Sequence, residues 1–275
     1  MVKYDFYWRG FKKTPNSDES LAGVGILIKH ESQIQIEDVG FNFSPRLISV
    51  TALVYGIRYY VLSVYMYPED PNRKVGLSAI EYAKIQEKHE QKKDRMYSEL
   101  SKAVKNRPSK SRLTIGGDFN ATSTAACTFT RLRGSKPVPE GSILNKNGIR
   151  LHDFVKKHDL AIMNTFWRTK KCQMDTWRHT SGFTKTVDYI LCDGLTSSWG
   201  TSCRVRSSYD FQTDHFLLVF TINQPFKRAD RLHHKPKKPE PDPIKQRNVK
   251  ELRNCPEYPV EIDRLLSDAE IPAQF

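Results

Sequence analysis

Acidic side chains at the ends of short apolar runs constrain this chain more than any other feature. The runs have the β-branched and apolar composition of buried strands. A carboxylate in such a place must be paired, hydrogen-bonded or bound to a cation, because an unpaired buried charge carries a desolvation penalty of several kcal/mol. Repeated placements of this kind in one chain therefore indicate a functional site. The acids and their polar neighbours are Asp118, Asn120, Asp188, Asp214 and His215.

Length and composition predict one domain with a basic surface. At 275 residues and 38% hydrophobic content, the chain can bury one sizeable core and carry a tail. Its 44 Lys and Arg residues against 31 Asp and Glu residues give a formal charge of +13. A field of that sign attracts polyanions, of which nucleic acid is the commonest, although the same charge also fits a purely solubilising role.

Cysteine spacing and hydropathy predict the compartment. The five cysteines show no CxxC spacing, so we interpret them as unpaired thiols in a reducing environment. The first residues contain no apolar core of a secretion signal, and no apolar run reaches the roughly eighteen residues that span a bilayer. We therefore expect a soluble intracellular protein with no membrane partner.

Apolar periodicity predicts alternating strands and helices. From 78 to 104 apolar residues recur at helical spacing, which predicts a long amphipathic helix. Asn147 is expected to cap a second helix with Leu151 on its apolar face. By count, these elements suit two sheets packed face to face with helices outside. The predicted strands are 23–28, 47–54, 59–65, 113–115, 160–166, 187–191 and 216–222, with a hairpin turn at 55–58.

Two further segments have the composition of connections. Residues 121–142 are rich in Thr, Ser, Gly and Pro, which predicts a long surface loop that carries substrate contacts. The first 223 residues form the predicted domain, and 224–275 form a basic, proline-rich linker with a weak amphipathic segment at 249–266. The basic run 235–238 is either a phosphate-contacting or nuclear-localisation patch, or an ordinary part of the linker.

The first acidic motif has a direct chemical use. Residues two apart in a strand face the same side, so Asp118 and Asn120 are expected to reach one site while Phe119 points into the core. A carboxylate there can orient or deprotonate an attacking water. The amide can donate a hydrogen bond to a phosphoryl oxygen without adding negative charge.

The remaining polar residues are a candidate metal ligand and a histidine with a carboxylate partner. Asp214 is an oxygen ligand suited to Mg²⁺ or Mn²⁺. His215 needs a carboxylate partner to fix its tautomer and favour its charged form, and Asp188 can supply it. A charged histidine stabilises the extra negative charge of a phosphoryl-transfer transition state. The set therefore predicts a metal-dependent site that cleaves phosphodiesters. Either motif alone is usually a turn or a surface feature, so the prediction depends on their co-occurrence.

The motifs in this order resemble those of the endonuclease/exonuclease/phosphatase superfamily. Within it, the chain is similar to the apurinic-type endonuclease domains of non-LTR (LINE) retrotransposons, especially the RTE-like ones, and to craniofacial-development-protein-2-like relatives. The match runs from about 4 to 222, with GDFNA at 117–121, VDYI at 187–190 and TDH at 213–215. The resemblance implies these roles: Asp118 on the nucleophilic water, Asn120 on the scissile phosphate, Asp188 on the histidine, Asp214 on the metal and His215 on the phosphate.

A tyrosine joins this set through the same resemblance. Tyr65 matches the tyrosine of the family's VYAP segment, which implies a phosphate contact. The proline here comes one position late, so Tyr67 is a rival for the role. The segments 164–166 and 176–177 also resemble the family's NTF and TW segments. We interpret Trp177 as a packing residue and leave it outside the predicted site.

One departure from the family pattern concerns the metal. The family's Gln-Glu-Thr motif, whose glutamate is a principal metal ligand, does not occur in the chain. Fewer anionic ligands predict weaker binding of Mg²⁺, which gives up its water reluctantly. We therefore interpret the chain as a four-layer α/β/β/α sandwich that lacks its first strand and helix. The Tyr-Ala-Asp-Asp motif of the reverse transcriptase that follows in complete elements does not occur either.

The resemblance implies a DNA-nicking hydrolase that uses Mg²⁺ or Mn²⁺, has DNA as its partner, and works in the nucleus without a small-molecule cofactor. Two alternatives remain open. One is a nucleic-acid-binding remnant without catalysis, which would use the basic surface alone. The other is a phosphatase or phosphodiesterase for small phosphorylated molecules, because the superfamily includes such enzymes.

Overall fold

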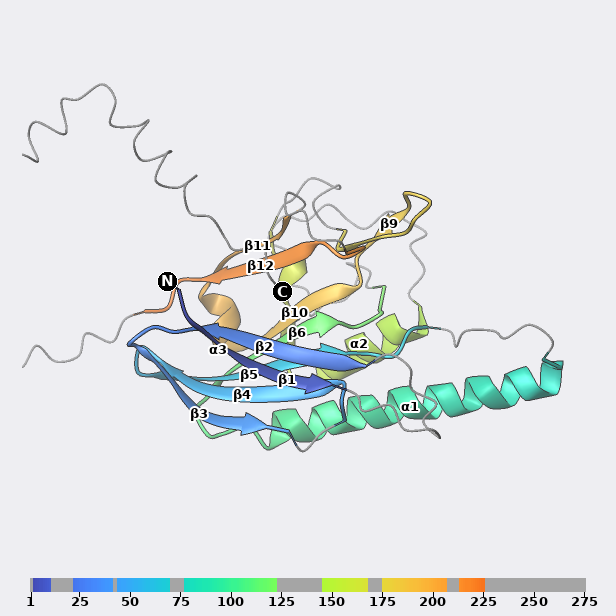
Figure 1. Ribbon diagram of the computed structural model, residues 1–275, viewed down its shortest axis with the longest axis horizontal. Coiled ribbons are helices and arrows are strands. Elements are labelled where there is room, and N and C mark those ends of the chain that lie inside the picture. Colours follow the sequence, from blue (N-terminus) through green and yellow to red (C-terminus); the bar gives the residue numbers. More distant parts are fainter. Residues whose placement is uncertain are drawn as a thin grey trace, which may run out of the picture. The chain divides into compact units, whose positions relative to one another are not determined.

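A six-stranded sheet forms the centre of the computed structural model (Figure 1). The structure describes residues 2–10, 22–41, 44–69, 77–122, 145–167, 175–206 and 213–225. The chain divides into two units, Met1–Phe226 and Lys227–Phe275, and all the described residues belong to the first. The predicted loop beyond 122, and the predicted tail beyond 225 with its basic run and amphipathic segment, lie outside the described residues.

The central sheet has the strand order β3-β4-β5-β6-β10-β7. Strands β5 and β6 are parallel, and every other neighbouring pair in this sheet is antiparallel. A parallel pair needs a crossover connection, and the long helix α1 (Ala79–Lys105) provides it. The strands are β3 (Ile34–Gly40), β4 (Leu47–Val54), β5 (Ile57–Tyr65), β6 (Arg112–Asp118), β10 (Asp188–Asp193) and β7 (Leu160–Ile162).

Helix α1 begins where the sequence has a capping box. The Ser78 side chain accepts from the backbone N–H of Glu81, while the Glu81 carboxylate accepts from the backbone N–H of Ser78. Met96 and Leu100 are buried on the face that contacts the sheet. No helix in the described ranges is long and apolar enough to cross a membrane.

Helix α2 (Lys146–Lys157) corrects one prediction. Its N-cap is Asn145, whose side chain accepts from the backbone N–H of Gly148 at 2.7 Å. Asn147, the predicted cap, lies inside the first turn and is buried. Two asparagines two positions apart are equally good caps by sequence, and only the packing of α2 against the sheet decides between them.

The two faces of the central sheet carry different side chains. Along β5, β6 and β10, every second residue packs against α1 and α2, as Leu62, Ile115 and Leu191 do in the main hydrophobic core. Because side chains alternate along a strand, the residues between them point to the opposite face. That opposite face carries the residues predicted for the site.

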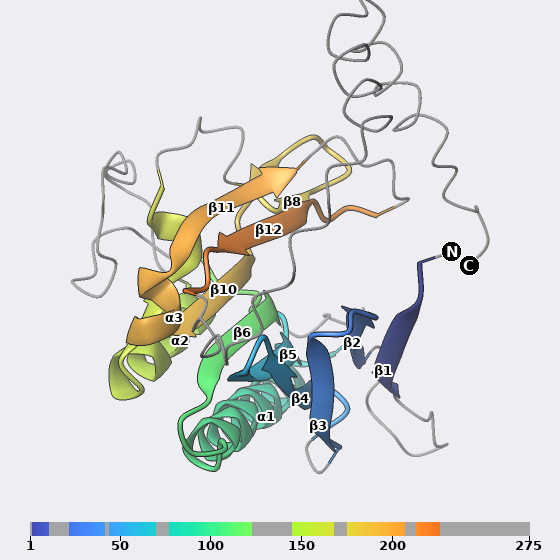
Figure 2. The same ribbon diagram turned by 90° about the vertical axis from the view of Figure 1, so that its left-hand side faces the viewer.

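Two ribbons lie on that opposite face. The first is β1 (Tyr4–Gly10) paired with β2 (Gly23–Lys29), and β2 contacts β4 and β5. The second is β11 (Gly200–Arg206) paired with β12 (Leu217–Ile222), and β12 contacts β10. Figure 2 shows α1 on one side of the sheet and β11–β12 on the other. The order of helix, sheet and second β layer agrees with the predicted α/β sandwich.

A second hydrophobic cluster joins the ribbon β11–β12 to the sheet. It consists of Met163, Cys192 and Cys203, with Trp167 and Phe220 packed against it. Both cysteines are free and buried. The unpaired state predicted for the cysteines is therefore confirmed for these two; the other three lie outside the described residues.

Two features of the strand predictions were wrong. The strand predicted over 160–166 ends at Ile162 and continues as a short 3-10 helix, η1 (Met163–Thr165). Beyond Ile162 a side-chain hydrogen bond replaces the backbone pairing with β10: Asn164 Oδ1 accepts from the backbone N–H of Ile190 at 3.0 Å. Strands β1, β3 and β11 were not predicted, because they form no continuous apolar run. The residues of β1 and β3 are half-buried or exposed, and in β11 an exposed residue separates the buried Cys203 and Val205.

Candidate active site

Three of the predicted residues lie side by side at one end of the central sheet. Tyr65 ends β5 and is the register partner of Asp118, which ends β6. Asp118 is in turn the register partner of Asp188, the first residue of β10. Register partners point to the same face of a sheet, so these side chains share the face opposite the helices. The sheet therefore brings together residues that are far apart in the sequence.

The predicted pair of Asp188 and His215 is present. His215 lies just before β12, and its Nδ1 is 2.9 Å from Asp188 Oδ2. An ionised carboxylate only accepts, so Nδ1 carries the hydrogen and donates it. This hydrogen bond is the largest cause that raises the pKa of His215 above its usual value, and it favours the charged imidazolium.

Asp118 is mostly buried beside a like charge. Burial, and then the negative charge of Asp188, raise the pKa of Asp118 to about 6. Its Oδ1 accepts from the backbone N–H of Asn120 at 2.8 Å, which partly offsets the cost of burial. A carboxylate with such a pKa remains largely ionised at neutral pH and is more basic than an exposed aspartate.

Asn120 is near Asp118 for a different reason from the predicted one. It lies outside β6, with a φ of 46°, so the alternation of a strand does not place it. Its Nδ2 donates to Met66 O at 2.9 Å and to Asp118 Oδ2 at 3.2 Å. Phe119 is fully buried in the core, as predicted. In this structure the amide of Asn120 therefore supports Asp118, and its contact with a phosphate stays a prediction.

Tyr65 and Tyr67, the two candidates for the phosphate contact, lie in different surroundings. Tyr65 lies in the row with Asp118, whereas Tyr67 follows the strand and packs against the helix-side core. The buried guanidinium of Arg46 contacts both rings, with 4.7 Å from its Cζ to the Tyr65 centroid and 4.1 Å to the Tyr67 centroid. The arrangement favours Tyr65 as the site residue, with Arg46 holding both tyrosines.

Asp214 has a partner that the sequence prediction missed. Trp177 Nε1 donates to Asp214 Oδ2 at 2.7 Å, and Lys185 Nζ lies 4.7 Å from the Trp177 ring centroid. Trp177 and His215 are also paired as an isolated β-bridge. Trp177 therefore belongs to the surroundings of the site, which its resemblance to the TW segment could have indicated.

Two further residues fix the backbone around Asp188. Thr176 is fully buried, and its hydroxyl accepts from the backbone N–H groups of Val187 and Asp188, both at 3.0 Å. Asn164 Nδ2 donates to Asp188 O at 2.8 Å. Both residues lie in segments that resemble family motifs, but the sequence alone assigns a role to neither.

The described residues do not assemble a metal site. No group of three or more His, Cys, Asp or Glu side chains among them is placed to hold a metal ion. Asp214, the predicted ligand, accepts a hydrogen bond from Trp177 Nε1, and Asp188 accepts one from His215 Nδ1. The role of a divalent ion at Asp214 therefore stays a prediction.

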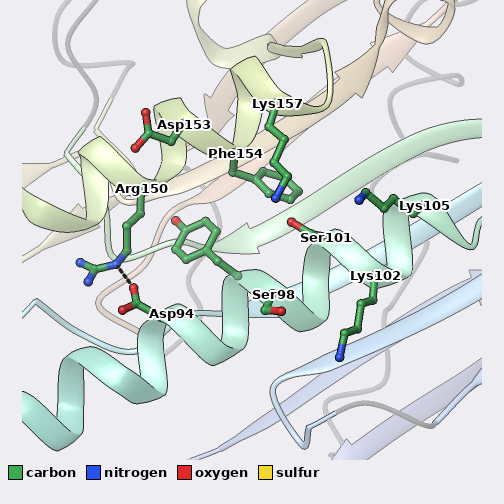
Figure 3. Close-up of a pocket in the computed structure, with 10 residues that line it drawn as sticks. Asp94, Ser98, Ser101, Lys102, Lys105, Arg150, Asp153, Phe154 and Lys157 are labelled. Carbon is green, nitrogen blue, oxygen red and sulfur yellow. Dashed lines mark hydrogen bonds and ion pairs between the residues drawn. The ribbon is translucent and has the colours of Figure 1, made fainter.

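Two cavities lie elsewhere. A groove of about 440 Å³ separates α1 and α2, and Figure 3 shows Arg150 paired with Asp94 on its wall. A cleft of about 530 Å³ lies among β2, β5 and β12, lined mainly by apolar residues such as Val61 and Phe220. Neither cavity is lined by a predicted site residue. Residue chemistry, and not cavity size, therefore locates the candidate site.

The buried charge of Asp118 predicts a pH-dependent stability. Its folded-state pKa of about 6 lies above the unfolded value of 3.8, so the folded chain binds more protons between these pH values. The contribution of Asp118 to stability should therefore fall as pH rises from about 4 to about 6. Asp118→Asn removes this penalty, so the stability gained over the parent should be larger near pH 8 than near pH 4, by up to about 3 kcal/mol. Chemical unfolding in EDTA at both pH values measures it, and equal gains would contradict the prediction.

Comparisons with solved structures identify the fold. The 3′ phosphatase NExo from Neisseria, bound to a product DNA hairpin, matches with a TM-score of 0.51 and 15% identity over 80% of each chain. The 3′-5′ exonuclease NExo from Neisseria meningitidis gives the same values. The endonuclease domain of TRAS1, a telomere-specific non-LTR retrotransposon, gives a TM-score of 0.50 and 17% identity over 81% of this chain and 78% of that one. The chain has the endonuclease/exonuclease/phosphatase fold.

At these identities the likeness extends to the fold alone. No family sequence model matches the chain, and no curated protein sequence matches it. The structures that share the endonuclease/exonuclease/phosphatase fold are described as a phosphatase, an exonuclease and an endonuclease, so the fold is compatible with several phosphoester reactions. The choice among them depends on the site residues of this chain.

Proposed function

We propose that this chain is a phosphodiester hydrolase that nicks DNA, and that it derives from the endonuclease domain of a non-LTR retrotransposon. One observation carries the proposal: Tyr65, Asp118 and the hydrogen-bonded pair Asp188–His215 converge on one face of the sheet, at one end. An acid with a raised pKa beside a histidine held by a second acid is an arrangement typical of acid–base chemistry.

Each residue then has a part in the reaction. Asp118 orients a water molecule and accepts its proton, because the raised pKa makes it a stronger base than an exposed aspartate. His215, kept charged by Asp188, stabilises the negative charge that develops on the phosphoryl oxygens. The Tyr65 hydroxyl donates a hydrogen bond to the same phosphate. The water attacks phosphorus and the bond to the 3′ oxygen of the strand breaks. The departing oxygen takes a proton from solvent to become a 3′-hydroxyl end, and the phosphate stays on the 5′ end of the other fragment.

DNA is the proposed substrate because of charge and because of the comparisons. The formal charge of +13 favours a polyanion over a small phosphoester. NExo was solved with a DNA hairpin, and TRAS1 is a retrotransposon endonuclease. A DNA substrate places the protein in the nucleus, and this location is part of the proposal. The proposed requirement for Mg²⁺ or Mn²⁺ rests on the resemblance, since the described residues form no three-ligand group.

The proposal is tested by incubating the purified chain with supercoiled plasmid in Mg²⁺, in Mn²⁺ and in EDTA. Conversion to the relaxed form in either metal, with none in EDTA, is the expected result. A 3′-phosphorylated DNA hairpin and a small phosphodiester are assayed in parallel. Hydrolysis of the small ester alone would replace the proposed function with that of a small-molecule phosphodiesterase, and release of phosphate from the hairpin alone would replace it with that of a DNA phosphatase.

A second candidate function is nucleic-acid binding without turnover. The observation that favours it is the lack of a three-ligand metal group among the described residues. Binding through phosphate neutralisation predicts an affinity for duplex DNA that falls roughly tenfold or more between about 50 mM and 200 mM salt, with little sequence preference. Fluorescence anisotropy measures this dependence. Metal-dependent nicking would exclude the candidate, whereas salt-sensitive binding without product in Mn²⁺ would support it.

A further inference from the structure

One buried amide connects two loops of the candidate site. Asn147, in the first turn of α2, is 1% exposed. Its Nδ2 donates to Tyr67 O at 2.9 Å and to Asn120 O at 3.0 Å. Tyr67 belongs to the segment that follows β5, and Asn120 to the segment that follows β6. The Asn147 side chain therefore connects the segments that directly follow Tyr65 and Asp118, in addition to the bond from Asn120 Nδ2 to Met66 O.

The acceptor of this amide has an uncommon backbone conformation. Asn120 has a φ of 46°, in the left-handed region, which asparagine adopts more readily than most residues with a side chain but which is still a minority conformation. Its carbonyl also accepts from Asn145 Nδ2 at 3.2 Å. Such a conformation persists where the surroundings hold it in place, and two amide groups from the start of α2 do so here.

Asn147 is itself held firmly. Its backbone N–H and that of Lys146 donate to the two carboxylate oxygens of Glu69, at 3.1 Å and 3.0 Å. An acidic side chain at a helix N-terminus is favourable, because the first N–H groups have no partner inside the helix. The buried Lys93 of α1 donates to Glu69 O. The start of α2 is thus anchored to the segment after β5 independently of the Asn147 side chain.

We propose that Asn147 is a positioning residue of the candidate site. It acts through Asn120, whose backbone N–H and Nδ2 both donate to the Asp118 carboxylate. Loss of the Asn147 amide frees the Asn120 carbonyl, lets its φ relax, and thereby moves the Asp118 carboxylate relative to Tyr65. The effect on catalysis rests on the proposed function, whereas the effect on Asn120 does not.

The test compares variants in the same helix. Asn147→Ala removes the bridging amide. Leu151→Ala is the matched control, because Leu151 is fully buried in the core and its apolar side chain makes no hydrogen bond to the Asn120 carbonyl. Asn145→Ser keeps a side-chain oxygen that can cap the Gly148 N–H and removes the weaker donor to Asn120 O without adding a charge. Should Asn147→Ala fail to fold, Asn147→Ser, whose hydroxyl is too short to reach both carbonyls, takes its place.

The first readout needs no activity. With selective ¹⁵N labelling of asparagine, the three-bond coupling and the hydrogen-exchange rate of the Asn120 amide report its φ and its protection. We expect Asn147→Ala to change both, Asn145→Ser to change them less, and Leu151→Ala to lower the melting temperature while leaving both unchanged. If the coupling and the exchange rate of the Asn120 amide are the same in Asn147→Ala as in the parent, the proposal is wrong.

The second readout separates positioning from stability. Below the melting temperatures of all variants, Asn147→Ala should lower kcat for plasmid nicking by about 10-fold to 100-fold with KM changed by less than about 3-fold, because misplaced catalytic groups lose rate more than binding. Leu151→Ala should retain the parental kcat, and an equal loss of kcat in both variants would assign Asn147 a merely structural role. If the parent does not nick at all, the proposed function fails, while the Asn120 signal still decides the positioning role.

Discussion

Replacing Asp118 or His215 by alanine is expected to lower plasmid nicking by about 10³-fold each. In the proposed mechanism, Asp118 is the base for the attacking water and His215 carries the positive charge opposite the developing oxyanion, so both would act mainly in the transition state. The loss should therefore fall on kcat rather than on KM. Initial rates of relaxation of supercoiled DNA, measured at saturating DNA, give this comparison directly.

Matched controls come from residues of the same types away from the site. Asp153 is exposed on α2, and His30 is exposed and paired with Asp5 at 2.7 Å. Asp153→Ala and His30→Ala should nick within about 2-fold of the parent, because surface changes away from such features have small effects. If Asp118→Ala or His215→Ala nicks as fast as these controls, the assigned roles are wrong. The same set measured in duplex binding should show little change, since neither residue is proposed to carry the affinity.

Gly117→Ala is expected to destabilise the fold by about 3 kcal/mol or more. Gly117 has a φ of 149°, which side-chain-bearing residues rarely adopt, and a Cβ built there would lie 1.9 Å from Val64 O. The obstacle is the backbone of the neighbouring strand β5, so it cannot move aside as a flexible side chain would. The close approach of β5 and β6 is also what brings Tyr65 next to Asp118. The substitution should therefore abolish nicking together with stability.

The neighbouring glycine provides the control for this prediction. A Cβ added at Gly116 would meet no heavy atom within 4 Å beyond its own chain neighbours, so Gly116→Ala should change the free energy of unfolding by less than about 1 kcal/mol. Urea unfolding of both variants and the parent measures the difference. Similar midpoints for Gly116→Ala and Gly117→Ala would show that the strand spacing at this point is not the constraint.

Much of the fold could be predicted because its signals are local. The capping box of Ser78 and Glu81 together with the helical period indicates the start and length of α1. Strand β4 is an almost continuous buried apolar run, and its predicted bounds agree with those of the structure. Strand β1 was missed, because Phe6 and Trp8 alternate with half-buried neighbours and no apolar run marks it. Edge ribbons carry a weaker pattern than strands that are covered on both faces.

Some features of the candidate site could also be predicted from the sequence, and others could not. The chemistry of Asp118, Asp188 and His215 followed from residue types in motif order, and the predicted contact between Asp188 and His215 is present at 2.9 Å. The contact between Trp177 and Asp214 was missed, because nothing in either local segment indicates that the two meet. The raised pKa of Asp118 could not be predicted from the sequence either, because it depends on burial and on the charge of Asp188 in another strand.

Short segments of the amino-acid chain were enough to predict which side chains are candidates for phosphoester chemistry and which strand ends carry them, because side-chain chemistry and periodicity are local properties. The packed fold was needed to establish that Asn145, and not Asn147, caps α2, and that the Asn147 side chain instead donates to the carbonyl of Asn120. These outcomes depend on buried hydrogen bonds between segments separated by 25 residues or more in the chain. Such bonds form only after the sheet and its helices have packed.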